Sequence, residues 1–180
     1  MSKSVKARRI KGGKITTTVV CVLMCVMLGA VGAYGQSYQS LYPLLVDLSG
    51  WNGAEPEGMN MEMPGMKMVN AVRAYQRGKR EFTAMIVIGN TAMAGYTSPQ
   101  GMMNMETDEA KVVVKMIRGF QVTTVYDKKD RSGAVSVMLL PGEKGGAVFT
   151  LSFEEMSSEQ ALNLAEKFDW KVMQEKVKSF

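Results

Sequence analysis

The chain has 180 residues, no histidine, and 22 Lys and Arg against 17 Asp and Glu, for a formal net charge of +5. Without histidine, Ser-His-Asp and Cys-His nucleophile systems are excluded, and so are most zinc sites. The commonest general base is also missing. An enzyme built from this sequence would have to use carboxylate, lysine or tyrosine chemistry, so we expect a non-enzymatic protein.

The first 35 residues predict a secretory signal peptide. Residues 1–14 hold six Lys or Arg and no acid, and residues 15–34 are uncharged and mostly apolar. A basic segment, an apolar segment and then small residues are the pattern of an exported protein, periplasmic or secreted. We expect cleavage before Tyr34 or, preferably, before Gln36. The alternative is an uncleaved anchor, because about 20 apolar residues can span a bilayer. We expect a membrane as a partner only in that case.

Removing the leader changes the charge and the thiol content. Residues 36–180 keep 16 basic and 17 acidic residues, and both cysteines, Cys21 and Cys25, lie in the leader. No basic face remains, so we expect no nucleic-acid partner. The absence of thiols leaves burial alone to stabilise the domain. The length of 36–180 predicts a single domain.

The first part of this domain predicts one helix and one β-hairpin. A helix ending at Gly50 is indicated by leucines at the spacing i, i+3, i+4 and i+7: Leu41, Leu44, Leu45 and Leu48. Two extended runs within 66–88 flank a turn at 77–80, which predicts a hairpin. The stretch up to Met105 is ambiguous, with a short helix expected near 92–95.

The second part predicts an antiparallel meander followed by helices. Strand-like runs at 112–114, 121–126, 134–140 and 147–153 are separated by polar turns. Ser157 and Gln160 have the spacing of a capping box, so a helix is expected to begin near Ser158, and 169–177 continues or restarts it. Strands followed by helices favour an α+β fold. We expect an antiparallel sheet of about five to six strands with helices packed on one face, preceded by the signal peptide helix.

The order of residues resembles a family of small uncharacterised secreted bacterial proteins. The likeness rests on Gly50-Trp51 with Glu55 and Glu57, on Arg73-Ala74-Tyr75, on the turn from Tyr126 to Gly133, and on Phe168-Asp169 at a helix end. The element order is also similar to the fold shared by the Mog1 and PsbP proteins and the LpqN-type lipoproteins. The resemblance implies this fold and export, and it implies no activity and no functional residue.

The most specific functional hypothesis from the sequence concerns its methionines. Fourteen of the 17 methionines follow the leader, and five of them fall within 59–68. Alternate residues of an extended chain share one face, and Pro64-Gly65 fits the centre of a type II turn. If the chain reverses there, Met63 pairs with Met66 and Met61 with Met68. Thioethers are soft, neutral ligands that suit Cu(I). Met61, Met63, Met66 and Met68 are therefore a candidate Cu(I) site, similar to the methionine motifs of periplasmic copper-handling proteins, and Met102, Met103 or Met105 could add a ligand.

The alternative role for the same residues is structural or partner-binding. Methionine fills irregular cores and lines adaptable binding surfaces, so a period-two pattern is typical of a buried strand face. A two-residue type II turn also splays the strands of a hairpin. We therefore prefer a non-enzymatic extracytoplasmic protein that binds a partner protein or small ligand through its sheet face or residues 51–68. A periplasmic Cu(I)-binding protein is the alternative, a His/Cys-free enzyme comes last, and no cofactor other than copper is expected.

Other conspicuous residues are expected to be structural. The acid pairs Asp108-Glu109 and Glu154-Glu155 are expected to be solvated, because sequence neighbours point to opposite sides of a strand. The glycine-rich stretch 142–146 lacks the spacing of a phosphate loop and leads into a strand, which favours a hairpin loop. Trp51, beside a helix end, is expected to cap the core and not to serve as an exposed binding aromatic.

Overall fold

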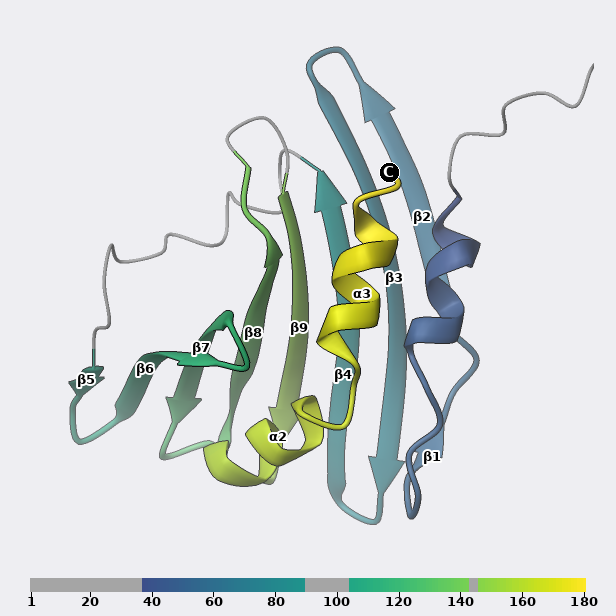
Figure 1. The fold of residues 1–180 in the computed structure, drawn as a ribbon. Coiled ribbons are helices and arrows are strands. Elements are labelled where there is room, and N and C mark those ends of the chain that lie inside the picture. Colours follow the sequence, from purple (N-terminus) through teal and green to yellow (C-terminus); the bar gives the residue numbers. More distant parts are fainter. Residues whose placement is uncertain (1–36, 90–103, 143–145) are drawn as a thin grey trace, which may run out of the picture. The chain divides into compact units, whose positions relative to one another are not determined.

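The computed structural model describes residues 37–89, 104–142 and 146–180, which all lie within the unit Gly35–Phe180. The elements in chain order are η1 (Tyr38–Leu44), β1 (Asn52–Gly53), β2 (Glu57–Met63), β3 (Met66–Arg77), β4 (Arg80–Gly89), β5 (Asn104–Glu106), β6 (Ala110–Ile117), β7 (Phe120–Asp127), β8 (Ser132–Leu140), β9 (Gly146–Glu154), α2 (Ser158–Ala165) and α3 (Trp170–Val177) (Figure 1).

The expectation of five to six strands with helices packed on one face is wrong. In the described residues the chain is mostly antiparallel β-sheet, with nine strands making up 54% and three short helices making up 18%. The extra strands are β1, β2 and β5. The helices contact the sheet at separate places, η1 against β2 and β3, and α2 and α3 chiefly against β8. The sheet, and not a helical layer, is therefore the main body of the domain.

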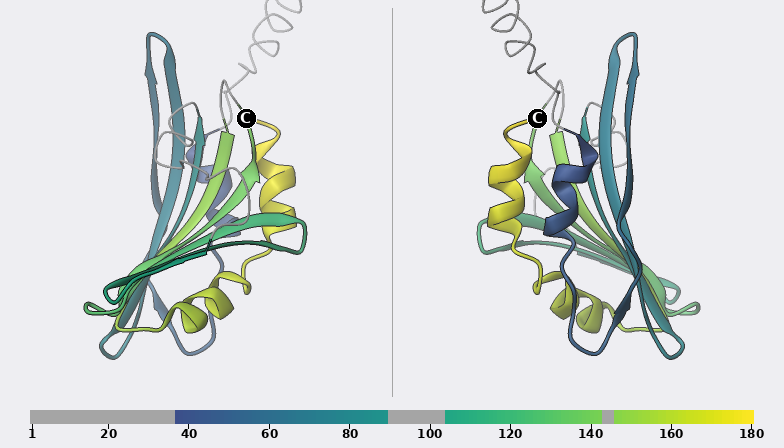
Figure 2. Two further views of the ribbon diagram at one scale, coloured as in Figure 1. Left: turned by 90° about the vertical axis from the view of Figure 1, so that its left-hand side faces the viewer. Right: turned by 90° about the vertical axis from the view of Figure 1, so that its right-hand side faces the viewer.

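All nine strands form one sheet with antiparallel pairing throughout. Its order is β1-β3-β4-β9-β8-β7-β6-β5, and β2 also pairs with β3. The predicted meander is confirmed by the consecutive pairs from β6 to β9, and the pairing of β4 with β9 joins it to the first hairpins. Seen from the side, the β3–β4 hairpin and the β6–β7 hairpin run in clearly different directions, which is the expected twist of a large sheet (Figure 2).

Two local signals in the sequence, the turn at 77–80 and the capping box at Ser157, give the structures that they predict. Arg77 pairs with Arg80 across the β3–β4 turn, where Gly78 has a φ of +63°. Ser157 and Gln160 form a complete capping box, and α2 begins at Ser158 as expected. The first helix differs, because it is a 3₁₀ helix that ends at Leu44, well before Gly50.

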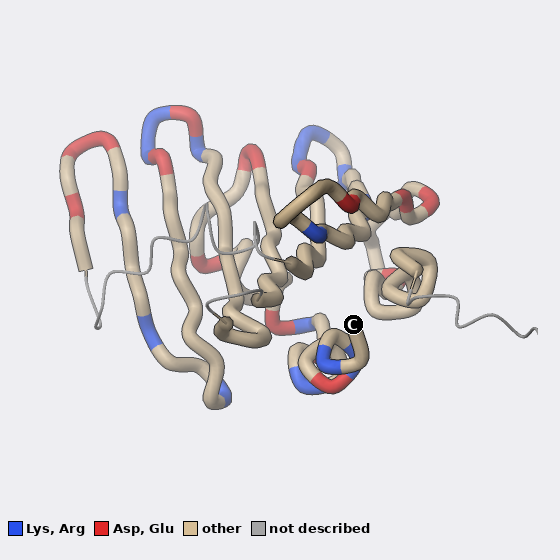
Figure 3. Tube along the Cα trace, turned by 90° about the horizontal axis from the view of Figure 1, so that it is seen from above, with Lys and Arg blue, Asp and Glu red and all other residues tan. Residues whose placement is uncertain are grey.

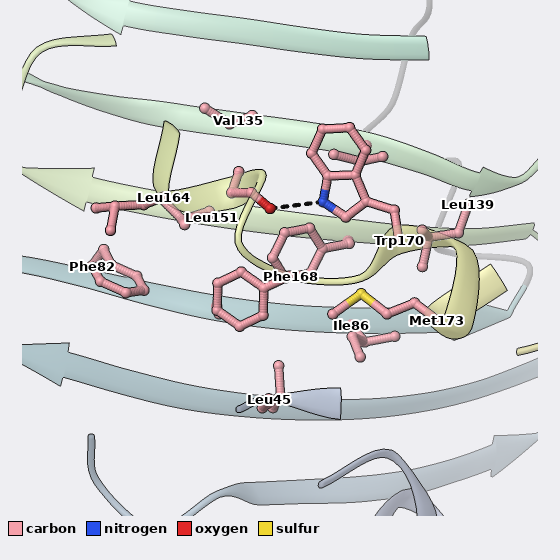
Figure 4. Close-up of a cluster of buried hydrophobic side chains, with 14 of the residues drawn as sticks. Leu45, Phe82, Ile86, Val135, Leu139, Leu151, Leu164, Phe168, Trp170 and Met173 are labelled. Atoms are coloured by element: carbon pink, nitrogen blue, oxygen red, sulfur yellow. Dashed lines mark hydrogen bonds between the residues drawn. The ribbon is translucent and has the colours of Figure 1, made fainter. Parts of the chain in front are cut away.

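The core lies on one face of the sheet, which we call the inner face. Aromatic side chains fill its centre: the Phe168 ring lies 5.0 Å from that of Phe149, and the Tyr75 ring stacks on Phe82 at 4.5 Å. Trp170 Nε1 donates a hydrogen bond to the Ala165 carbonyl oxygen at 2.8 Å (Figure 4). Since the buried indole N–H is satisfied, this tryptophan can lie in the core at little cost.

No described helix is long and apolar enough to cross a membrane. The predicted leader, residues 1–35, and the short helix expected near 92–95 both lie outside the described residues.

Candidate functional site: a methionine face on the sheet

The β2–β3 hairpin has the pairing that the sequence predicts. Met61 lies opposite Met68, and Met63 lies opposite Met66. Directly opposite residues of an antiparallel pair point to the same face of the sheet, and so do alternate residues along one strand. The four side chains therefore share one face, and Met59 joins them on β2.

Pro64 and Gly65 make the turn of this hairpin. Gly65 has a φ of +79°, which matches the third position of a type II turn and is rarely adopted by other residues. The strands pair right up to this turn, because Met63 and Met66 are partners. Splaying by a type II turn therefore does not open the hairpin at its tip.

The methionines lie on the outer face of the sheet, opposite the core. Val69, Ala71 and Tyr75 of β3 are buried in the core, so the residues between them face outward. The pairing across the sheet places nine of the eleven methionines in the described residues on this outer face: Met59, Met61, Met63, Met66, Met68, Met85, Met105, Met116 and Met138. The other two, Met156 and Met173, are buried. The methionine pattern on β2 and β3 therefore does not mark a buried strand face.

The outer face also carries most of the exposed apolar side chains. Seven large hydrophobic residues of the described chain are exposed, and five of these lie on this face: Met59, Met63, Met105, Met116 and Val125. Met61, Met66 and Met68 are half-buried. Single exposed apolar residues are ordinary on protein surfaces, but their gathering on one face is typical of an interaction surface.

Charge is distributed unevenly over the two faces. Among the described strand residues, no Lys or Arg faces outward, and the outward-facing acids stand at or near strand ends: Glu57, Glu81, Asp127 and Glu154. Seen from above, the charged residues gather mainly in turns and helices, and the middle parts of most strands are uncharged (Figure 3). The outer face therefore combines methionine with an absence of cations.

Strand β2 is held from its inner side by η1. On that side the Tyr38 N–H donates to Asn60 Oδ1 at 3.2 Å, and on the outer side the Met59 N–H donates to Oδ1 of Asn70 on β3 at 3.1 Å. A Cβ on Gly58 would lie 2.4 Å from the Asn70 carbonyl oxygen and 2.8 Å from Tyr38 Cδ2. A glycine is thus required for β2 to approach β3 and η1 this closely, and the backbone that carries the methionines is firmly placed.

A polar cluster around Arg73 ties the N-terminal segment to β3. The Arg73 guanidinium donates to the carbonyl oxygens of Ala54 and Leu45, both at 2.7 Å, and to Asp47 Oδ1 at 2.5 Å. Sequence reasoning missed this role of Arg73. No motif signals it, because two of the three acceptors are backbone carbonyls, 19 and 28 residues away.

Tyr75 extends the same cluster into the core. Its hydroxyl donates to the Val46 carbonyl oxygen at 2.8 Å, and burial raises the pKa of Tyr75 to about 12, against the weaker opposing effect of Arg73. Tyr75 therefore stays protonated at neutral pH and cannot act there as a base. Its role is to fasten the loop after η1 to the sheet.

The acidic residues do not form an enclosed site. Asp108, Glu109, Glu154 and Glu155 are exposed, as expected. Glu81 lies opposite Glu154 at an open cleft of about 320 Å³, where water has access to both. No group of three or more His, Cys, Asp or Glu that could hold a metal ion occurs in the described part of the chain.

The Glu106 carboxylate forms ion pairs with two lysines. It forms ion pairs with Lys128 at 2.9 Å and Lys111 at 3.0 Å, and hydrogen bonds from these two lysines lower its pKa. The carboxylate is therefore ionised, and two lysines of the same domain neutralise its charge, which indicates a structural role.

Trp51 packs at the edge of the core, as expected. Its ring meets Phe82 edge-on at 4.7 Å, and it is partly buried. It also borders an open cleft of about 330 Å³ whose other lining residues include Arg77, Arg80 and Lys167. Met102, Met103 and residues 143–145, which the sequence also singled out, lie outside the described residues.

Comparison with known proteins finds no matching family model, no matching curated protein and no matching solved structure. The resemblance to small secreted bacterial proteins and to the Mog1/PsbP-like fold therefore stays a prediction. The fold and the site together define the chain as an antiparallel β-sheet protein whose outer face is rich in methionine and carries no Lys or Arg on its described strands.

Proposed function

We propose that this chain is a non-enzymatic extracytoplasmic protein that binds a partner protein through the outer face of its sheet. The observation that carries the proposal is the placement of nine methionines on that face, away from the core. Methionine is flexible and polarisable, and it is used heavily on surfaces that adapt to a partner. These residues add little to the core, so a surface role accounts for them.

A protein fits this face better than a small ligand does. Small-molecule sites are concave and largely enclosed. The outer face, in contrast, extends across the whole sheet, from β2 near one edge to β5 at the other. A typical protein interface buries about 800 Å² on each partner, which requires a broad surface of this kind. The acids near the strand ends, such as Glu57 and Glu81, favour a partner with an apolar centre and basic residues at its rim.

The extracytoplasmic part of the proposal rests on the leader. A basic segment, an apolar segment and small residues precede the domain. Residues 36–180 contain no cysteine, so folding of the domain does not depend on disulfide formation in its compartment.

The proposal is tested by site-specific photo-cross-linking in cells of the source organism. A photo-reactive amino acid is placed at Met63 or at Met116, and at Val172 as the matched control, an exposed apolar residue on α3. We expect the same heterologous adduct from Met63 and Met116 and none from Val172, and a second change, Met59→Lys, should weaken the Met63 adduct. The proposal fails if the outer-face positions give no adduct, if Val172 gives the same adduct, or if the only adduct is a second copy of this chain.

A further inference from the structure

Four thioether groups are brought together at one end of the outer face. The pairs Met61–Met68 and Met63–Met66 are adjacent along the β2–β3 hairpin, so the side chains form a two-by-two array. Directly opposite Cβ atoms in a sheet lie about 4.5–5.5 Å apart, and diagonal ones about 7–8 Å apart. A methionine side chain has three rotatable bonds. The four sulfurs can therefore reach a common point above the strands without any backbone change.

The two described positions that continue the row of Met61 and Met68 across the sheet are glycines. Met68 lies opposite Gly89 of β4, and Gly89 lies opposite Gly146 of β9. A Cβ on Gly89 would come 2.0 Å from the Lys67 carbonyl oxygen, and its φ is +135°, so the position requires glycine. Neither Gly89 nor Gly146 therefore crowds Met68 from the β4 side.

The chemistry of the array is that of a soft-metal site. The charged residues of the hairpin nearest to it, Glu62 and Lys67, lie opposite each other in the strand register and face the inner side. The methionine side therefore offers sulfur without the carboxylate oxygens that hard cations prefer. Thioether ligands select Cu(I) among the common biological metals. We propose that Met61, Met63, Met66 and Met68 form a Cu(I)-binding site on the β2–β3 hairpin.

Two properties follow from ligands of this kind. Thioethers carry no proton to release, so the affinity for Cu(I) is independent of pH, unlike that of sites built from thiolate or imidazole. Met63 is 48% exposed, so the ion is reachable from solvent and can be exchanged with other carriers. The site is separate from the core, and its occupancy leaves the fold unchanged.

The test is an anaerobic Cu(I) titration against a chromogenic chelator. The full chain carries Cys21→Ser and Cys25→Ser, which removes the competing thiols. We expect a single Cu(I) bound with a Kd of about 1 μM or tighter. Changing Met61→Leu together with Met66→Leu removes one sulfur from each pair and should weaken binding by about tenfold or more. Met105 lies on β5, at the opposite edge of the sheet from the β2–β3 hairpin, and so is not a ligand of this site. The matched control, Met105→Leu with Met116→Leu on the same face, should therefore leave the affinity unchanged.

Further measurements make the outcome decisive. X-ray absorption at the copper edge should show sulfur as the only nearest neighbour, and the affinity should be equal at pH 7 and pH 5.5. Leucine conserves the volume of methionine, and the array is outside the core, so both double variants should unfold at the same denaturant concentration as the parent. Binding weaker than micromolar, equal affinities for the two double variants, or oxygen and nitrogen neighbours would overturn the site. Because this titration needs no partner protein, its failure leaves the cross-linking result standing, and the converse also holds.

Discussion

Replacing Arg73 with methionine should destabilise the domain by about 3 kcal/mol. The arginine side chain is 13% exposed, and its guanidinium donates two hydrogen bonds of 2.7 Å to backbone carbonyl oxygens of the segment that carries η1. A hydrogen bond to a charged group contributes about 1.5–3 kcal/mol. We take the lower figure for each bond, because the released carbonyls regain some contact with water. The ion pair with Asp47 adds at most about 1 kcal/mol, since that carboxylate is 90% exposed.

Urea unfolding followed by circular dichroism measures this loss. With a denaturant slope of about 2 kcal/mol/M, the midpoint should fall by about 1.5 M. The control is Asp47→Asn, which removes the exposed partner alone and should cost less than about 1 kcal/mol. The reasoning is refuted if Arg73→Met unfolds within about 0.2 M of the parent, or if Asp47→Asn is equally damaging.

Three further predictions concern protonation, oxidation and processing. Because the folded-state pKa of Tyr75, about 12, exceeds its unfolded value, its contribution is present below pH 10 and is lost as the pH rises to 12. Stability should therefore fall over this window by about 2 kcal/mol, a loss that Tyr75→Phe should lack. Limited treatment with hydrogen peroxide should oxidise Met59 and Met63, each 48% exposed, well before the buried Met173, and similar rates by peptide mass spectrometry would contradict the outer-face placement. Intact mass of the protein from its source cells should show Gln36 as the first residue, whereas an uncut chain would indicate an anchor.

The sequence predicts those parts of the fold that depend on local rules. The Ser157–Gln160 capping box and the turn between Arg77 and Arg80 involve residues three apart, and both form as expected. The sequence indicates strand β2 less clearly than the later strands. Its methionines alternate with Gly58, Asn60 and Glu62, and these three residue types are uncommon in strands. The two-residue β1 and the three-residue β5 are too short to give a pattern, so the sheet is larger than the sequence indicates.

The sequence predicts which methionines of the candidate site lie opposite each other, but not the face of the sheet on which they lie. Pro64 and Gly65 indicate the turn, and the turn determines which methionines are opposite each other. The face on which they lie is not indicated, because alternation of methionine with polar residues normally places the apolar side inward. Here the inner side is taken by Gly58 and Asn60, which lie against η1. That contact joins segments distant in the sequence, and no pattern within β2 reveals it.

The division of the sheet into two faces has a consequence for engineering. Most of the buried hydrophobic residues lie on the inner face and in the helices, and the exposed Met59 and Met63 are not among them. The exposed outer positions, such as Met59 and Met63, can therefore be exchanged for other residues, for instance threonine, which suits a pleated surface. Val114 and Val148 also face outward, but they are buried and should be kept. The domain could therefore serve as a scaffold that displays chosen side chains on the outer face, while the core on the inner face stays unchanged.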